Sequence, residues 1–214
     1  MATATQTNFA DPSPVVRPTI GPERHGLAMP YAEFVASDFR DGWRYELARG
    51  VVIVTEVPGI HHGRIVLRVA RLFFMCDLTY PGVINYQAGG MECRLRIEGM
   101  KSDRHPHQAV YLGPHPEGVR LWETWVPELV VEVVSPGGGD RDYVAKREEY
   151  LAVGVLEYWV LDPILRRMLV LLNCGGAWRE ILVSDDATYQ CETLPGLEVV
   201  VGDLLGPTIP VKGD

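Results

Sequence analysis

The sequence predicts an α/β protein whose mixed β-sheet is flanked by helices. Two short, almost continuous apolar runs, at 129–134 and 156–161, have the length of strands that are buried on both faces. Two longer segments, at 61–78 and 143–153, repeat apolar residues every three or four positions, as helices packed on a sheet do. Chemically unusual residues gather at the ends of the central strands, where open α/β sheets commonly form their sites.

The composition indicates one domain. The chain has 214 residues, a formal net charge of −8, and 47% hydrophobic against 22% charged residues, which allows a sizeable core. We expect a mobile leader over 1–28, a single domain over 29–206 and a tail over 207–214. The leader lacks the apolar core of a signal peptide and no segment resembles a membrane span, so we expect a cytoplasmic protein.

Charge and cysteine spacing argue against two other kinds of protein. The acidic total is unlike a surface that coats nucleic acid broadly, although a local basic groove is compatible with it. The cysteines are scattered, without the paired spacing of a zinc site, so we expect reduced structural thiols. They are Cys76, Cys93, Cys174 and Cys191.

The first predicted elements are a short helix over 31–38 and a hairpin. Its strands flank Arg49-Gly50, a tight-turn signal, and continue into the apolar run 51–57. Glu46 lies beside apolar residues in the first strand. Considered alone, this carboxylate is expected to be solvated.

Segment 61–78 is the clearest helix of the chain. One side is apolar, and a second row carries arginines at four- and three-residue spacing. Such a row can follow a phosphate backbone, although a solvated face that forms ion pairs has the same pattern. The row consists of Arg64, Arg68 and Arg71. His62, near the helix start, is expected to cap the helix or pack.

A sheet region follows, with strands expected over 83–87, 91–97 and 109–112. The loop before the last strand concentrates charged and imidazole side chains. They are Asp103, Arg104, His105 and His107. This concentration is either incidental or the sign of a metal-binding loop.

The segment from 125 to 150 places charges where a core should tolerate none. Glu132 lies in the middle of the apolar strand 129–134, and an unpaired buried anion costs several kcal/mol. A Ser-Pro-Gly-Gly-Gly turn ends the strand, after which Asp140 or Asp142 can cap the helix 143–153. On that helix, Lys146 shares the inward stripe.

Two interpretations of this pair of charges stay open. Glu132 can bind a metal while Lys146 orients or polarises the attacking water. Alternatively, the two form a structural ion pair, or Lys146 extends its ammonium to solvent. The rest of the chain predicts a strand at 156–161, a hairpin of 168–173 with 178–183, and a closing segment over 192–205.

Five motifs follow one another along the chain: YEL-x-x-G from Tyr45, His-Gly-Arg-Ile from His62, P-x-Q-A-V-Y-L from Pro106, PELVVEVVSP from Pro127, and K-x-x-x-Y-x-x-x-G-V-x-E-Y-W-V-L-D-P from Lys146. Together they resemble the Uma family, whose members are classed as restriction endonucleases of the PD-(D/E)xK nuclease superfamily. The similarity spans roughly 29–205. It implies a restriction-endonuclease-like core in which acidic residues on neighbouring strands hold a divalent metal ion.

Three residues match the family's functional positions. Glu46 matches the early acidic residue, Glu132 the strand carboxylate and Lys146 the lysine, which in this family has moved from the strand to the following helix. The resemblance implies metal-dependent hydrolysis of DNA phosphodiester bonds. Glu132 and residue 107 would hold the metal, Glu46 would assist through water or a second metal, and Lys146 would position the attacking water.

Position 107 departs from the family, whose pattern there is Pro-Asp, because this chain has Pro106-His107. Mg²⁺ prefers oxygen ligands, whereas imidazole suits Mn²⁺ or another transition metal. We therefore expect Mg²⁺ or Mn²⁺, with Mn²⁺ favoured if His107 is a ligand. Three alternatives stay open: His107 binds a softer metal, Asp103 substitutes for the missing aspartate, or the site is degenerate.

DNA is the implied partner. Phosphate contacts are expected from Arg64, Arg68, Arg71, Arg141 and Arg147. A homodimer is compatible with the resemblance, because cutting both strands requires two sites, although no interface signature is visible. The rival interpretation is a module that keeps the nuclease scaffold and binds nucleic acid or a protein partner without catalysis. A third is an unrelated α/β protein in which Glu132 and Lys146 merely pair.

Overall fold

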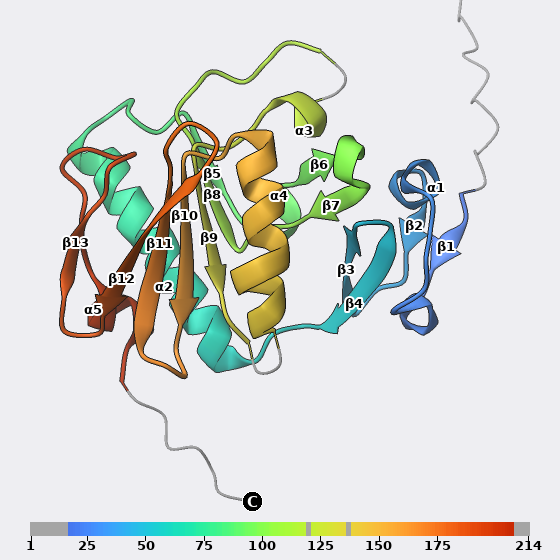
Figure 1. The fold of residues 1–214 in the computed structure, drawn as a ribbon, viewed down its shortest axis with the longest axis horizontal. Coiled ribbons are helices and arrows are strands. Elements are labelled where there is room, and N and C mark those ends of the chain that lie inside the picture. Colours follow the sequence, from blue (N-terminus) through green and yellow to red (C-terminus); the bar gives the residue numbers. More distant parts are fainter. Residues whose placement is uncertain (1–16, 119–120, 136–137, 208–214) are drawn as a thin grey trace, which may run out of the picture.

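The computed structural model describes residues 17–118, 121–135 and 138–207. Within these residues the chain forms a six-stranded and a four-stranded β-sheet with helices packed around the larger one (Figure 1). The larger sheet has the order β12-β11-β10-β9-β8-β5. Its strands are β5 (Tyr86–Ala88), β8 (Gln108–Tyr111), β9 (Leu129–Val133), β10 (Glu157–Asp162), β11 (Arg167–Asn173) and β12 (Trp178–Ser184).

The larger sheet is mixed, as predicted. Strands β9 and β10 run parallel, and the neighbouring pairs are antiparallel. Both central strands are buried along their whole length, which explains why their sequences are almost continuously apolar. The helices are α1 (Tyr31–Val35), α2 (Ile60–Thr79), α3 (Leu121–Thr124), α4 (Lys146–Val153) and α5 (Val201–Leu205).

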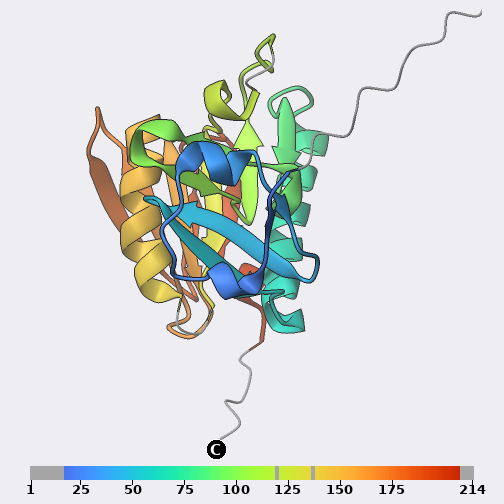
Figure 2. The same ribbon diagram turned by 90° about the vertical axis from the view of Figure 1, so that its right-hand side faces the viewer.

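Helices α2 and α4 cover opposite faces of this sheet (Figures 1 and 2). On one face Val131 of β9 belongs to the same core cluster as Phe73 of α2. On the other face Val130 of β9 shares a cluster with Tyr150 of α4. Because side chains alternate along a strand, Glu132 lies on the same face as Val130, toward α4.

The four-stranded sheet, in the order β4-β3-β7-β6, lies beside α4 (Figure 1). It contains the predicted hairpin, whose turn residues Arg49 and Gly50 have φ values of 49° and 83°. Leu95 and Ile97 join the core cluster of Tyr150. The strands are β3 (Trp43–Ala48), β4 (Val51–Glu56), β6 (Leu95–Ile97) and β7 (Ser102–Arg104).

Part of the expected leader belongs to the folded domain. Strand β1 (Thr19–Ile20) pairs in parallel with β2 (Asp38–Phe39). Ile20 is buried in a core cluster with residues of α1 and of the β3–β4 hairpin. The prediction of a mobile leader over 1–28 is therefore wrong for residues 17–28, because Ile20 supplies apolar surface that the hairpin covers. Residues 1–16 lie outside the described part of the chain.

The C-terminal part closes the domain. Strands β13 (Thr188–Gln190) and β14 (Glu198–Val200) form a hairpin, and α5 packs on α2. Of the expected tail, residues 208–214 lie outside the described residues. Within the described part of the chain, no helix has the length and hydrophobicity needed to span a lipid bilayer.

Several local predictions differ from the structure. The helix expected over 31–38 ends at Val35, and the strand expected over 83–87 is β5. The strand expected over 91–97 is shortened to β6, because Gly90 takes a φ of 63° and a 3₁₀ turn occupies Gly90–Glu92. Met91 is consequently exposed. The helix expected from 143 begins instead with a π-helical turn over Arg141–Ala145.

Candidate functional site

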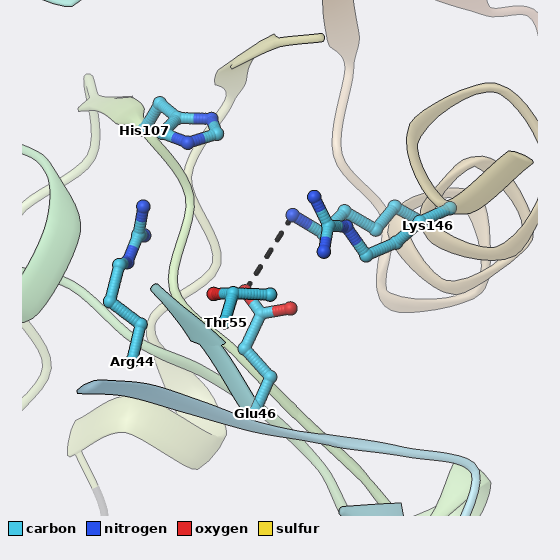
Figure 3. A pocket seen from close by; sticks show the side chains of 6 residues that line it. Arg44, Glu46, Thr55, His107 and Lys146 are labelled. Atoms are coloured by element: carbon cyan, nitrogen blue, oxygen red, sulfur yellow. Dashed lines mark ion pairs between the residues drawn. The ribbon is translucent and has the colours of Figure 1, made fainter. Parts of the chain in front are cut away.

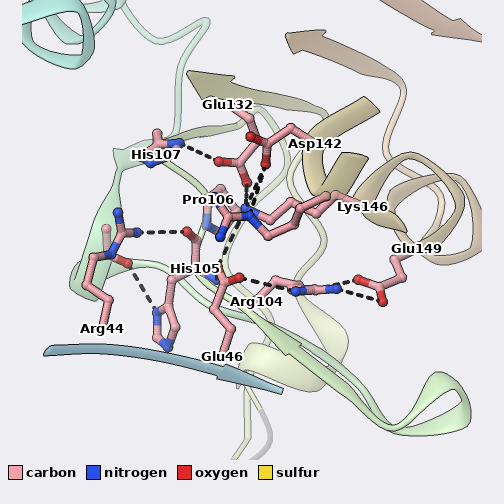
Figure 4. Close-up of polar contacts among 12 residues, drawn as sticks. Arg44, Glu46, Arg104, His105, Pro106, His107, Glu132, Asp142, Lys146 and Glu149 are labelled. Carbon is pink, nitrogen blue, oxygen red and sulfur yellow. Dashed lines mark hydrogen bonds and ion pairs between the residues drawn. The ribbon is translucent and has the colours of Figure 1, made fainter. Parts of the chain in front are cut away.

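The predicted charged residues converge where the two sheets and α4 meet (Figure 4). Glu46 comes from β3, Glu132 from β9 and Lys146 from the start of α4, and His107 stands directly before β8. The Lys146 ammonium lies 2.8 Å from Glu132 Oε1 and 3.6 Å from Glu46 Oε1. The two nearest side chains, Glu132 and Lys146, are 0% and 2% exposed. The prediction that Lys146 faces inward is confirmed.

Glu132 is held in one orientation by α4. Its Oε1 accepts hydrogen bonds from Lys146 Nζ at 2.8 Å and from the Tyr150 hydroxyl at 2.6 Å. Its Oε2 has no hydrogen-bond donor among the described residues and contacts His107 Nδ1. Burial alone would raise the pKa of Glu132, but Lys146 and His107 outweigh it and hold the pKa well below 4.5. Glu132 is therefore an ionised carboxylate whose Oε1 takes two hydrogen bonds and whose Oε2 lies against the His107 imidazole.

His107 is engaged on two sides. Its Nδ1 accepts the Val133 N–H at 3.2 Å, and its ring lies edge-on to the His62 ring with centroids 4.4 Å apart. His62 in turn donates to the Val133 carbonyl at 3.2 Å. Burial, with His107 next, lowers the pKa of His62 to about 4, so this second imidazole is neutral at pH 7. The prediction that His62 caps or packs is confirmed, and its packing partner is a residue of the site.

Glu46 is buried rather than solvated, because the second sheet supplies donors that its local sequence does not reveal. Its Oε2 lies 3.2 Å from Arg104 Nη1, and its Oε1 accepts the His105 N–H at 3.2 Å. Burial would raise the pKa of Glu46, but Lys146 and Arg104 lower it to about 2. Both oxygens of Glu46 are therefore occupied.

Arg104 joins the two layers of the site. This fully buried guanidinium also donates to Glu149 of α4, with Nε at 2.6 Å from Oε2 and Nη2 at 3.0 Å from Oε1. The Ser102 hydroxyl donates to the same Oε1 at 2.8 Å. The sequence grouped Arg104 with the polar loop but gave no partner, because Glu149 is 45 positions away.

Asp103 does not join the site. Ser102 and Arg104 face α4, so the side chain between them points to the opposite face of β7. There its Oδ1 accepts from Arg94 Nε at 2.7 Å, and its Oδ2 lies 3.6 Å from Arg96 Nε. The structure therefore does not bring Asp103 together with Glu132 and Lys146.

Asp142 belongs to this charged cluster, although the sequence predicted it as a possible helix cap. Neither it nor Asp140 caps the helix, which starts without a side-chain capping bond. The Asp142 carboxylate is fully buried, 3.4 Å from Lys146 Nζ and 3.6 Å from Arg141 Nε, and neither oxygen has a hydrogen-bond donor among the described residues. Burial raises its pKa, and Lys146 only partly offsets this.

A small pocket opens beside this cluster (Figure 3). Cationic side chains prevail around it, which suits an anionic group such as a phosphate. Its lining residues are Arg44, Glu46, Thr55, His107, Arg141 and Lys146. Arg44, which also donates to the His105 carbonyl at 3.3 Å, was not predicted, since it precedes the recognisable motif.

The expected arginines are scattered. Arg141 lines the pocket, whereas Arg68 bonds to the carbonyls of Leu204 and Leu205 at 3.4 Å. Arg147 pairs with Glu180 at 2.5 Å. Arg64 and Arg71 are exposed on α2. Of the five expected arginines, Arg141 lines the pocket, where Arg44 accompanies it.

The donor set suits a divalent ion that keeps most of its waters. Within the described ranges, no group of three or more His, Cys, Asp or Glu side chains is arranged as a ready metal cage. Mg²⁺ is commonly bound by one or two carboxylates, with waters and substrate phosphate completing its shell. Glu132 Oε2, which lies against His107 Nδ1 and receives no hydrogen bond from the described residues, could supply one such ligand.

Comparison with solved structures finds the same architecture in another protein. A protein from Anabaena variabilis ATCC 29413, described as "a putative nuclease belonging to DUF820", superposes with a TM-score of 0.66 over 83% of this chain and 97% of that chain, at 16% sequence identity. That similarity shows the shared fold. No curated protein matches the chain. Residues 31–204 match the family "Uma2: Putative restriction endonuclease", and the chain belongs to this family.

Proposed function

We propose that the chain is an endonuclease that hydrolyses DNA phosphodiester bonds with Mg²⁺ or Mn²⁺. The observation that supports it most is the buried Lys146 ammonium, held against Glu132 at the edge of a cation-lined pocket. A lysine buried at this cost among carboxylates is expected where it faces a reacting anion. Membership of Uma2 supports the same reaction class.

Each residue has a distinct task in this proposal. Glu132, through Oε2, would hold the divalent ion, which would polarise the phosphoryl oxygen and increase the acidity of a water. Lys146 positions the attacking water and offsets the negative charge that develops on the phosphate. Arg44 and Arg141 bind the phosphates next to the scissile bond. Tyr150 keeps Glu132 turned so that Oε2 faces the site.

The test is a metal titration of the full chain with supercoiled, linear and single-stranded DNA as substrates. We expect supercoiled DNA to be nicked or cut in Mg²⁺ or Mn²⁺. It should stay intact when EDTA is added, because Glu132 takes part in the proposed reaction by holding the divalent ion. Lack of cleavage of all three substrates in both metals would contradict the proposal. A sedimentation measurement in the same buffer tests the predicted homodimer.

A non-catalytic module on the nuclease scaffold is the second candidate, and His107 favours it. The family pattern has a carboxylate at this position, and losing one lowers the expected affinity for Mg²⁺. The variant His107→Asp distinguishes the two candidates. We expect wild type and variant both to cleave, with the variant needing less Mg²⁺. Cleavage by His107→Asp alone would instead establish that the natural chain is degenerate and binds nucleic acid or a protein without cutting.

A further inference from the structure

The carboxylates of the site differ in how many of their oxygens are already occupied. Both oxygens of Glu46 receive donors, and both oxygens of Glu149 do so too. Oε1 of Glu132 takes two donors. Among the described residues, the oxygens at this site that receive no hydrogen bond are Glu132 Oε2 and both oxygens of Asp142.

Without a bound ligand, the buried Asp142 carboxylate should destabilise the folded protein. A carboxylate that is fully buried and receives no hydrogen bond is strongly disfavoured. It does not cap its helix. Its charged neighbours are Lys146 at 3.4 Å, which Glu132 and Glu46 share, and Arg141 at 3.6 Å. One shared ammonium and one arginine leave its oxygens free to coordinate a cation.

The position of Asp142 is suited to that task. It lies on the π-helical turn Arg141–Ala145, a distortion that often marks functional positions. Its carboxylate and that of Glu132 approach the same Lys146 Nζ, at 3.4 and 2.8 Å (Figure 4). The carboxylates of Glu132 and Asp142 therefore approach one ammonium from consecutive elements of the chain.

His107 cannot supply the same ligand in its observed orientation. Its Nδ1 atom contacts Glu132 Oε2 and lies 3.2 Å from the Val133 nitrogen, so this atom is already engaged by two neighbours. An imidazole is also a poorer ligand than a carboxylate for Mg²⁺. The oxygen that the family places at position 107 must come from elsewhere in this chain.

We propose that Asp142 supplies the second carboxylate ligand, so that the divalent ion is held by Glu132 and Asp142 rather than by Glu132 and residue 107. This inference rests on the proposed metal-dependent function and names a ligand for it. His107 then orients the Val133 amide and packs on His62, and it is not a ligand. Compared with the family pattern, one carboxylate ligand would come from the turn before α4 instead of from the residue before β8.

The test measures Mn²⁺ binding to the full chain without DNA, by calorimetry and by the electron paramagnetic resonance signal of free Mn²⁺. We expect Asp142→Asn to weaken binding about tenfold or more, since one of two charged ligands is lost. The matched control is Asp140→Asn, which changes an exposed aspartate two positions away and leaves binding unchanged. His107→Asn is expected to bind Mn²⁺ nearly as tightly as wild type.

A thermal shift separates a lost ligand from a lost fold. Asn at 142 removes a buried charge whose oxygens receive no hydrogen bond, so the metal-free variant should melt no lower than wild type, while the rise in Tm that Mn²⁺ gives wild type should disappear. If Asp142→Asn does not fold, Asp142→Ala carries the same comparison. Unchanged Mn²⁺ affinity in a folded variant, or a large loss in His107→Asn, would overturn the inference.

Its failure and the failure of the proposed nuclease function have different signatures. Mn²⁺ binding that depends on Asp142, without cleavage of any DNA, would leave the ligand assignment standing and refute the nuclease function. DNA cleavage together with an Mn²⁺ affinity that does not depend on Asp142 would support the nuclease function and refute the ligand assignment. Absence of Mn²⁺ binding by wild type would overturn the ligand assignment directly.

Discussion

Replacing Lys146 by methionine is expected to reduce DNA cleavage by roughly a hundredfold to a thousandfold, the loss typical when one group that stabilises developing negative charge is removed. Methionine fills a similar volume, but it cannot position water or offset charge on the phosphate. Initial rates on supercoiled DNA in saturating Mn²⁺ give the comparison. The control is Arg179→Met, which breaks an exposed pair with Glu192 and should keep full activity.

The same variant has a pH-dependent stability. Without the ammonium, burial dominates the pKa values of Glu132 and Asp142 and raises both. A carboxyl group with a raised pKa in the folded state favours folding below its unfolded pKa, and this contribution is lost as pH rises from the unfolded pKa through the folded pKa. Urea unfolding should therefore show a larger penalty at pH 8 than at pH 5. Cleavage at the wild-type rate by folded Lys146→Met would refute the role of this residue.

Replacing Arg104 by methionine should destabilise the protein by about 3 to 5 kcal/mol, the usual effect of removing one partner of a buried ion pair. The change leaves Glu46 and Glu149 buried without the guanidinium that bridges them. An exposed pair gives the matched control, because Arg49→Met breaks the contact with Glu148 and should cost less than about 1 kcal/mol. Urea unfolding at pH 7 compares the two.

A second variant distinguishes lost charge pairing from lost packing. In Arg104→Met with Glu149→Leu, one of the two stranded carboxylates is gone, so part of the stability should return. Equal free energies of unfolding for Arg104→Met and Arg49→Met would contradict the assignment of Arg104 as the bridge between the sheets.

The sequence predicted the part of the site that one β-α-β unit builds. Glu132 stands out because it interrupts an apolar strand, and Lys146 because it occupies the inward stripe of the next helix, so local periodicity places both on facing surfaces. The 2.8 Å contact between them confirms that placement. The central strands, the hairpin turn at Arg49-Gly50 and the long helix α2 follow from equally local signals.

What local pattern could not provide is the docking of the second sheet. Glu46 was expected to be solvated, because its donors come from Arg104 and His105, which lie 58 and 59 positions away. The exclusion of Asp103 depends on which face of β7 turns toward α4, and a strand of three residues gives no periodicity to decide it. Asp142 matched a capping signal, and the π-helical turn that redirects it has no sequence signature here.

Helix α4 contacts both sheets within five residues. Lys146 and Tyr150 bond to Glu132 of the larger sheet, and Glu149 bonds to Arg104 and Ser102 of the smaller one. A rotation of α4 by a fraction of a turn would break both sets of bonds together. In the proposed reaction the whole scaffold would therefore fix the positions of Glu132 and Lys146, and adjustment to a particular DNA substrate would fall to the side chains at the pocket rim.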